Sequence, residues 1–232
     1  MKIVVFGANG PTGRLVVRAS LAAGHEVTAF TRHPEPFPDF GGALTVEAGD
    51  VFDPDPVARA VEGRDAVLSS LGVPYSRKPI SVYSEGTGNI VRAMEQAGVK
   101  RLVCVSSSAT DPAAGPHGGF LFERVLQPFI VNTMGKTMYA DMRAMESLVA
   151  ASALDWTVMR PSGLFTAAAV SDYRIAQAYL PGRFTARADL ADAMVNQLTD
   201  RTFVGTTAAV TTVTGTPNMG QLIWREVVAK PA

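Results

Sequence analysis

Three glycines near the N-terminus have the spacing of a dinucleotide site. Gly7, Gly10 and Gly13 follow the apolar run "KIVVF" and open a helix-like stretch. At such a turn the first helical N–H groups lack partners and the helix dipole adds positive charge, which favours a pyrophosphate. We assign Gly7 to the sharp turn, Gly10 to close approach of the ligand and Gly13 to helix–strand packing. Asn9 and Thr12 add side-chain donors; the alternative is an ordinary strand-to-helix turn.

The residues after the second apolar run, "EVTAF", bear on which dinucleotide is bound. A site that prefers NAD usually has Asp or Glu at this position, for the ribose hydroxyls. Thr31 and Arg32 stand there instead, and an arginine can fork onto a 2′-phosphate. Glu35 lies further on and is a weaker ribose ligand. We therefore predict NADP as the cofactor, with NADPH favoured over NADH; the alternative for Arg32 is a solvated loop arginine.

A third polar position follows the run "LTVEA". Asp50 and Val51, in "AGDVFD", come directly after it and are placed to meet the adenine. Asp50 is equally well explained as the N-cap of the next helix.

The remaining reactive side chains form no recognisable site. His25, His33 and His117 lack any metal-ligand spacing, so we predict no metal. Cys104 lies inside an apolar run and is interpreted as inert core.

These residues need elements to hold them, and the sequence alternates short β-branched runs with helix-period stretches. Strands are predicted at 2–6, 26–30, 44–48, 65–71, 101–107 and 155–161, and helices at 11–24, 53–63, 84–98 and 141–152. This order predicts an α/β fold, a Rossmann-like doubly wound parallel sheet. In such a sheet, ligands bind beyond the carboxyl ends of the strands, where the motifs above are expected to meet.

Two segments depart from the alternation. Residues 111–135 are apolar and irregular, and the tail from about 160 has one helix pattern at 187–200 and one strand pattern at 208–214. Both would start at the carboxyl edge of the sheet. We therefore predict a single domain over 1–232, with a small substrate-side cap built from about 111–135 and 160–190.

Composition limits the classes of function. The chain has 232 residues, enough for one sizeable core, and its 21 Lys and Arg balance its 21 Asp and Glu, which predicts no nucleic-acid or membrane partner. We find no apolar stretch long enough for a bilayer, no signal-peptide cleavage site and one cysteine. The expectation is a cytoplasmic monomer or homodimer whose partner is a small-molecule substrate.

The quoted motifs occur together in one family. "FGANGPTG", "GDVFD", "DAVLSSLG", "SEGTGNIVRAMEQAGVKRLVCVSSSA", "DMRAMESLVAASALDWTVMRPSGL" and "RADLADAMV" cover most of the chain in order. The sequence resembles an atypical short-chain dehydrogenase/reductase of the NAD(P)-binding, NmrA-like kind. Within it, the sequence is most similar to the biliverdin reductase B (flavin reductase) branch.

The resemblance implies which residues line the NADP site. Those near the pyrophosphate, the 2′-phosphate and the adenine would be Gly7, Asn9, Gly10, Pro11, Thr12, Gly13, Arg32, Asp50 and Val51. Leu71 and Gly72 would line the cofactor, Ser106 and Ser107 would lie near the nicotinamide, and Arg160, Pro161, Ser162 and Gly163 would pass under its ring.

The resemblance also raises the question of a proton donor. Classical members of the superfamily use a Tyr-x-x-x-Lys pair, and Tyr139 and Arg143 have this spacing with arginine for lysine. Aligned on "DWTVMRP", however, the family's pair falls on Met138 and Met142. Tyr139 is thus either a displaced catalytic residue or an ordinary packing partner.

Two acidic residues of the same stretch match the family's pattern. Asp141 and Glu146 are interpreted as structural, capping the chain or pairing with Arg143 and Arg160.

Without that pair, the chemistry has to be one that needs no protein acid. A flavin, quinone or extended tetrapyrrole accepts hydride and takes its proton from water. Substrate contacts are predicted from the aromatic residues Tyr75, Phe120, Phe122 and Phe165, with Met134, and the alternative for each is plain core. Ser107 is the best hydrogen-bonding candidate near the hydride, unless it only closes its own loop.

The sequence therefore predicts an NADPH-dependent oxidoreductase that reduces a flavin, quinone or similar conjugated small molecule. The alternatives are an NAD(P)-sensing, NmrA-like regulatory protein with little catalysis and a biosynthetic tailoring reductase.

Overall fold

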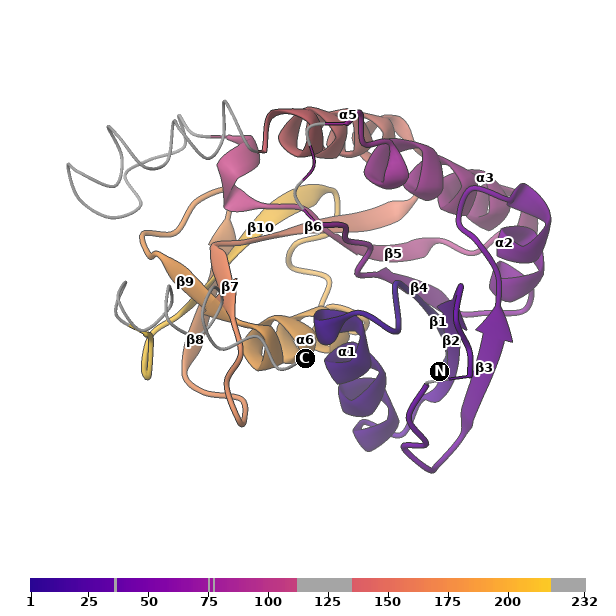
Figure 1. The fold of residues 1–232 in the computed structure, drawn as a ribbon, viewed down its shortest axis with the longest axis horizontal. Coiled ribbons are helices and arrows are strands. Elements are labelled where there is room, and N and C mark those ends of the chain that lie inside the picture. The colour runs from indigo at the N-terminus through magenta and orange to yellow at the C-terminus, as the bar shows by residue number, and fades with distance from the viewer. Residues whose placement is uncertain (36, 75, 77, 112–134, 218–232) are drawn as a thin grey trace.

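The computed structural model describes residues 1–35, 37–74, 76, 78–111 and 135–217. Its centre is an eight-stranded sheet in the order β3-β2-β1-β4-β5-β6-β10-β8 (Figure 1). The strands are β1 (Lys2–Phe6), β2 (Glu26–Thr31), β3 (Leu44–Ala48), β4 (Ala66–Ser69), β5 (Arg101–Val105), β6 (Asp155–Pro161), β8 (Tyr173–Gln177) and β10 (Thr206–Thr212). All neighbours pair in parallel except β8, which is antiparallel to β10. The predicted doubly wound parallel sheet is confirmed, except that β8 adds an antiparallel edge strand.

Helices cover both faces of this sheet (Figure 1). On one face α2 (Pro54–Val61), α3 (Thr87–Ala97) and α5 (Lys136–Ala151) bury apolar residues in one core cluster. On the other face α1 (Pro11–Ala22) and α6 (Arg187–Asn196) do the same in a second cluster. Strands such as β1 and β4 are buried on both sides, which explains why their sequences are continuously apolar.

The carboxyl end of β1 is where the direction of the strand order changes. β2 and β3 lie on one side of β1, and β4, β5 and β6 lie on the other. In open α/β sheets this switch point is the usual place for a ligand. The glycine turn lies there, between β1 and α1.

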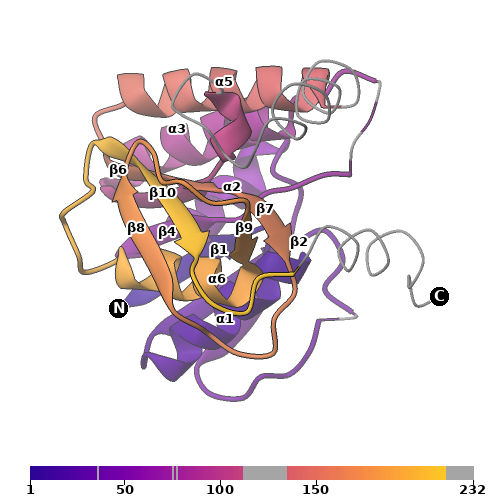
Figure 2. The ribbon, with the colours of Figure 1, turned by 90° about the vertical axis from the view of Figure 1, so that its left-hand side faces the viewer.

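The chain after β6 contains elements that the sequence reading missed. β7 (Gly163–Phe165) and β9 (Phe184–Ala186) form a small parallel pair, and β8 joins the edge of the main sheet beyond β10 (Figure 2). The predicted helix at 187–200 and strand at 208–214 are present as α6 and β10, with slightly different ends.

Two short helical turns were also missed. η1 (Val82–Gly86) is a π-type turn that leads into α3, and η2 (Ser108–Thr110) is a 3₁₀ turn after β5. Helix α5 begins at Lys136, five residues before the predicted start at 141. Among the described residues, no helix is long and apolar enough to cross a membrane.

Candidate functional site

The three glycines of the N-terminal turn differ in what a side chain would meet. Gly7 has φ +72°, and a Cβ there would lie 2.6 Å from the carbonyl oxygen of Ser70. A Cβ on Gly13 would lie 2.1 Å from the carbonyl oxygen of Gly7, so α1 packs directly on the turn. Among the described residues, a Cβ on Gly10 would meet only that same oxygen, at 3.4 Å. Gly7 and Gly13 are thus required by the protein's own backbone, whereas the space at Gly10 is open to a ligand.

The start of α1 has no cap or counter-charge of its own. Its N-cap, Gly10, offers no side-chain hydrogen bond, Pro11 occupies the first position, and the first turn holds no acidic residue. The free N–H groups and the positive end of the helix dipole are therefore left uncompensated by the helix itself. That a pyrophosphate binds here stays a prediction.

Asn9 connects this turn to the loop after β2. Its Nδ2 donates to the carbonyl oxygen of His33 over 3.4 Å, and its Oδ1 accepts from Nε and one terminal nitrogen of Arg14, at 2.9 and 2.6 Å. Arg32 is exposed beside His33. The contact with Arg14 was not anticipated, because a lone arginine inside a helix pattern carries no spacing that indicates its partner.

The predicted adenine side is a packed wall. A Cβ on Gly86 would lie 2.9 Å from Cγ2 of Val51 and 3.3 Å from Cδ1 of Leu71, so these three residues are in close contact. Asp50 accepts a hydrogen bond from the N–H of Phe52, at 3.1 Å. The alternative role for Asp50 is wrong, because the N-cap of α2 is Asp53, whose Oδ1 accepts from the N–H of Asp55.

Asp141 of α5 holds the turn that follows this wall. The carboxylate is buried and accepts from the N–H groups of Tyr83 and Ser84, at 2.9 and 3.3 Å, and from the Ser84 hydroxyl. These bonds secure η1, which ends at Gly86. The structural interpretation of Asp141 is therefore confirmed.

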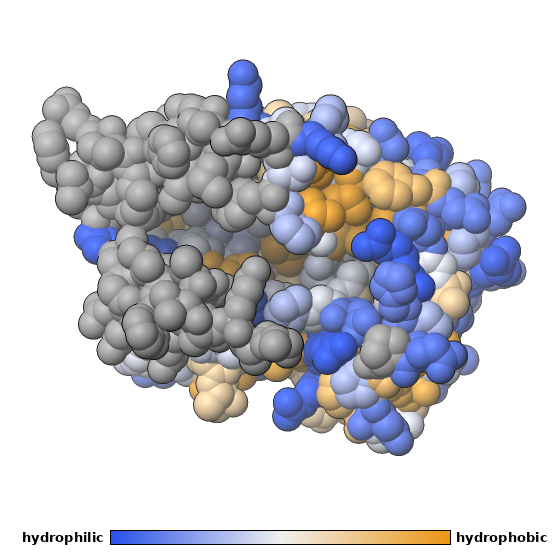
Figure 3. Space-filling view, viewed as in Figure 1, coloured by the Kyte–Doolittle hydropathy of each residue, from blue (hydrophilic) through white to orange (hydrophobic). Residues whose placement is uncertain are grey.

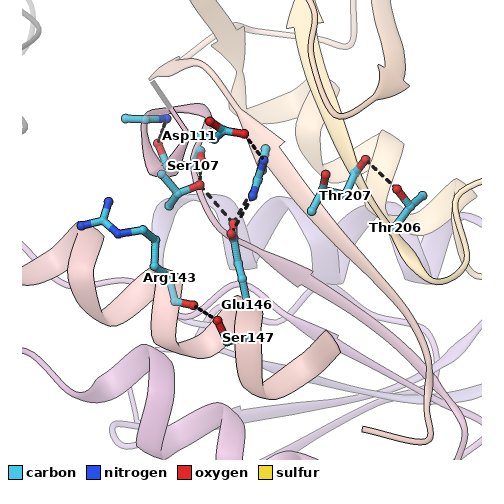
Figure 4. Close-up of polar contacts among 10 residues, drawn as sticks. Ser107, Asp111, Arg143, Glu146, Ser147, Thr206 and Thr207 are labelled. Carbon is cyan, nitrogen blue, oxygen red and sulfur yellow. Dashed lines mark hydrogen bonds and ion pairs between the residues drawn. The ribbon is translucent and has the colours of Figure 1, made fainter. Parts of the chain in front are cut away.

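Ser107 closes the loop after β5. Its Oγ accepts from the N–H of Ala109 at 3.2 Å, and its carbonyl oxygen accepts from the N–H and hydroxyl of Thr110 (Figure 4). Ser106, one residue earlier, is buried. The bonds to Ser107 are those of a loop-closing serine, and its predicted role near the hydride stays a prediction.

A partly buried ion pair lies beside this loop. Glu146 of α5 accepts from Nε and a terminal nitrogen of Arg160 at 3.0 and 2.7 Å, and from the hydroxyl of Thr110 at 3.1 Å (Figure 4). Asp111 lies 3.6 Å from Arg160. Burial lowers the pKa of Arg160, but the hydrogen bond and charge of Glu146, with the charge of Asp111, raise it overall. The expected pairing of Glu146 with Arg160 is confirmed.

The stretch of α5 that carries Tyr139 buries three large side chains beside Asp141. Met138, Tyr139 and Met142 are 7%, 5% and 6% exposed and belong to one core cluster. Arg143 is exposed. Whether Tyr139 takes part in catalysis stays a prediction.

The segment after β6 is tied down by its own contacts. Pro161 is buried, and Ser162 donates from its N–H to the Thr185 hydroxyl and from its own hydroxyl to the carbonyl oxygen of Gly182, both at 3.0 Å. Phe165 is buried edge-on against Phe184, with ring centroids 6.3 Å apart.

The other predicted substrate residues, Tyr75, Phe120 and Phe122, lie outside the described residues, as do His117, Met134 and nearly all of 111–135. Figure 3 shows that apolar side chains gather around a hollow near the middle of the molecule.

Two further reactive features can be placed. Cys104 is fully buried in β5, and burial, helped by the charge of Glu146, raises the pKa of its thiol to about 12. Among the residues the structure describes, no group of three or more His, Cys, Asp or Glu is placed to hold a metal ion.

Comparison with known proteins identifies a family pattern that spans the site. A model of an NAD(P)H-binding family matches residues 7–201, from the first glycine to beyond α6. A 3-beta-hydroxysteroid dehydrogenase of Mycolicibacterium neoaurum is 34% identical over 119 residues, covering 47% of this chain and 32% of that protein. A chloroplastic protein of Arabidopsis thaliana is 31% identical over 173 residues, covering 70% and 59%. The chain thus spans less than two thirds of these relatives.

Solved structures share the fold. An oxidoreductase of Lactococcus lactis superposes with a TM-score of 0.77 at 18% identity, covering 98% of this chain and 97% of the other. A short-chain dehydrogenase/reductase of Veillonella parvula in complex with NADP has a TM-score of 0.73 at 19% identity, covering 90% and 94%.

Proposed function

Because this chain belongs to the NAD(P)H-binding family, we propose that it is an oxidoreductase that reduces a flavin, quinone or similar conjugated small molecule with NADPH. NADPH would supply a hydride and leave as NADP⁺, while the substrate takes its proton from water. Within the family we place it in the NmrA-like, flavin reductase-like branch.

The proposed substrate class rests on two buried residues of α5. Carbonyl reduction needs a proton donor next to the new alkoxide. The two positions aligned with the superfamily's donor pair are Met138 and Met142, and both are buried in the core. A methionine cannot donate a proton, so the proposal favours substrates whose reduction needs stacking and orientation rather than an acid.

The cofactor preference rests on the end of β2. No carboxylate follows Thr31 directly, and the next residue is the exposed Arg32. The turn at Gly10 and the uncapped start of α1 fit a pyrophosphate, and the wall of Val51 and Leu71 fits an adenine. In this proposal Arg32 binds the 2′-phosphate.

The protein's own residues would otherwise orient the ligands. Ser106 and Ser107 lie at the carboxyl end of β5, and Pro161 and Ser162 at that of β6, which is paired with β5. The Glu146–Arg160 pair holds α5 to β6 and, through Thr110, holds the loop after Ser107. This arrangement would keep the floor of the hydride-transfer site in place.

The test is NADPH oxidation, followed at 340 nm, against FMN, menadione and a panel of aldehydes and ketones. We expect turnover with at least one flavin or quinone and little with the carbonyl compounds. Efficient reduction of carbonyl compounds alone would overturn the substrate class. Tight NADPH binding without turnover of any acceptor would instead support the NAD(P)-sensing regulator. Met138 and Met142, in place of the donor pair, are also consistent with a protein that catalyses little.

A further inference from the structure

Arg14 is a cation at the wrong end of its helix. It occupies the first turn of α1, where the helix dipole is positive and a positive side chain is unfavourable. The first turn has no acidic residue, and Arg14 forms no ion pair with a carboxylate of the described residues. The charge is partly buried rather than free in solvent. An arrangement that costs stability in the free protein is expected where a ligand supplies the missing negative charge.

The contacts of Arg14 show where that ligand charge would lie. Nε and one terminal nitrogen are used on Oδ1 of Asn9, at 2.9 and 2.6 Å, which leaves the other terminal nitrogen for a further acceptor. Asn9 in turn donates to the carbonyl oxygen of His33. Asn9 therefore links the guanidinium of Arg14 to the loop after β2, at the residue that follows Arg32 in the chain.

We propose that Arg14 is a second specificity-determining residue, which binds the 2′-phosphate of NADPH together with Arg32. This inference rests on the proposed function, because it assumes that the dinucleotide lies across the carboxyl ends of β1 and β2. In dinucleotide-binding folds the loop after the second strand meets the ribose, and an arginine there accommodates the 2′-phosphate. Asn9 is the positioning residue, since it directs Arg14 toward that loop rather than along the helix.

The same helix provides a matched control. Arg18 lies one turn after Arg14 and is exposed on the surface of α1. It has the same charge and the same helix, but no hydrogen bond to the glycine turn among the described contacts. The effect of losing a positive charge from α1 can thus be separated from the effect of losing it at this position.

The experiment compares Arg14→Gln, Arg14→Lys and Arg18→Gln with the unaltered protein in titrations with NADPH, NADH, adenosine 2′,5′-bisphosphate and AMP. Arg14→Gln should weaken NADPH and the bisphosphate by about tenfold or more, because a charge-assisted hydrogen bond is lost. NADH and AMP should stay within about twofold, since they lack the 2′-phosphate. Arg18→Gln should change nothing, and Arg14→Lys, which keeps the charge but not the planar guanidinium that Asn9 holds, should fall between.

Three results would overturn the inference. Arg14→Gln could behave like Arg18→Gln, or it could weaken NADH as much as NADPH, which would place Arg14 at the pyrophosphate or in the turn itself. If Arg14→Gln does not fold, Arg14→Lys decides, because a lysine variant with full NADPH preference would show that the guanidinium held by Asn9 does not set that preference. Failure of the unaltered protein to bind either dinucleotide would instead refute the proposed function.

Discussion

Arg32 is the residue on which the proposed choice of NADPH over NADH depends most directly. Replacing it by alanine removes a charge-assisted fork worth about 1.5–3 kcal/mol. We expect Arg32→Ala to weaken NADPH roughly ten- to hundredfold and to leave NADH nearly unchanged, as measured by calorimetric or fluorescence titration. Equal affinities for the two cofactors in the unaltered protein would contradict this prediction.

A substitution at Tyr139 tests whether the proton for reduction comes from water or from this side chain. Its side chain is 5% exposed and packs with Met138 and Met142 in the core on the α5 face. Because phenylalanine preserves that packing, Tyr139→Phe should keep most of the activity with a flavin or quinone. A fall in kcat of about a hundredfold or more, the scale of a positioned acid, would reveal a displaced catalytic pair.

At the scale of single residues, the sequence was most informative where spacing carried the chemistry. The glycine triplet and Arg32 are defined by their distance from an apolar run, and the pairing of Glu146 with Arg160 was anticipated. The role proposed for Arg14 was not anticipated, because it depends on hydrogen bonds to Asn9 and on a helix dipole that exist only in the folded chain. Asp53, not Asp50, is the N-cap of α2, and the sequence could not separate the two because each aspartate accepts a bond from the N–H two residues later.

At the scale of elements, the junction of β1 and α1 allows two glycines to be tested against each other. A Cβ on Gly13 would lie 2.1 Å from one backbone oxygen and 2.8 Å from the Cα of Ala8, and backbone cannot yield as a side chain can. We expect Gly13→Ala to lower the free energy of unfolding by about 2 kcal/mol or more. Chemical denaturation measures this directly.

Gly10→Ala is the matched partner. Among the described residues its nearest neighbour, at 3.4 Å, leaves room for a methyl group, so the free energy of unfolding should fall by only about 1 kcal/mol or less, the cost of alanine at an N-cap. NADPH binding should nevertheless weaken by about tenfold or more, because the methyl group fills the space that a pyrophosphate needs. If Gly10→Ala binds NADPH normally, the pyrophosphate does not approach at this turn.

Elements could be predicted where periodicity is strong and local. The six strands from β1 to β6 and helices α1, α2 and α6 lie close to their predicted ranges. β7 and β9 were not predicted because three residues are too few to show a periodic pattern. β8 was not predicted because its residues are only partly buried and do not alternate strictly. η1 is held by Asp141, which lies more than fifty residues away in the sequence. A reading of neighbouring residues alone therefore cannot predict this turn.

At the scale of the whole molecule, Cys104 reports on global opening. It is the chain's one cysteine and lies fully buried in β5, near the middle of the sheet. With a pKa of about 12 in place of 9.0, its thiolate population at pH 8 falls about a thousandfold, and the sulfur is also shielded. We expect no reaction of the native protein with 5,5′-dithiobis(2-nitrobenzoate) over minutes, and one equivalent after unfolding.

The labelling rate should then follow stability. A destabilised variant such as Gly13→Ala should react faster in proportion to its unfolded fraction, while Gly10→Ala should react more slowly than Gly13→Ala. Rapid labelling of the native protein would show that β5 is accessible by a local opening instead.

The position of β10 between β6 and β8 has a consequence for biosynthesis. β8 leaves the ribosome first, yet its partner in the sheet is β10, which follows later in the chain. At typical elongation rates the nascent chain would wait roughly one to six seconds between the two strands. During that interval the outer edge of β6 has no partner strand, and such an edge can recruit a second chain. A nascent-chain chaperone is therefore expected to engage this protein late, after most of its sheet has already been made.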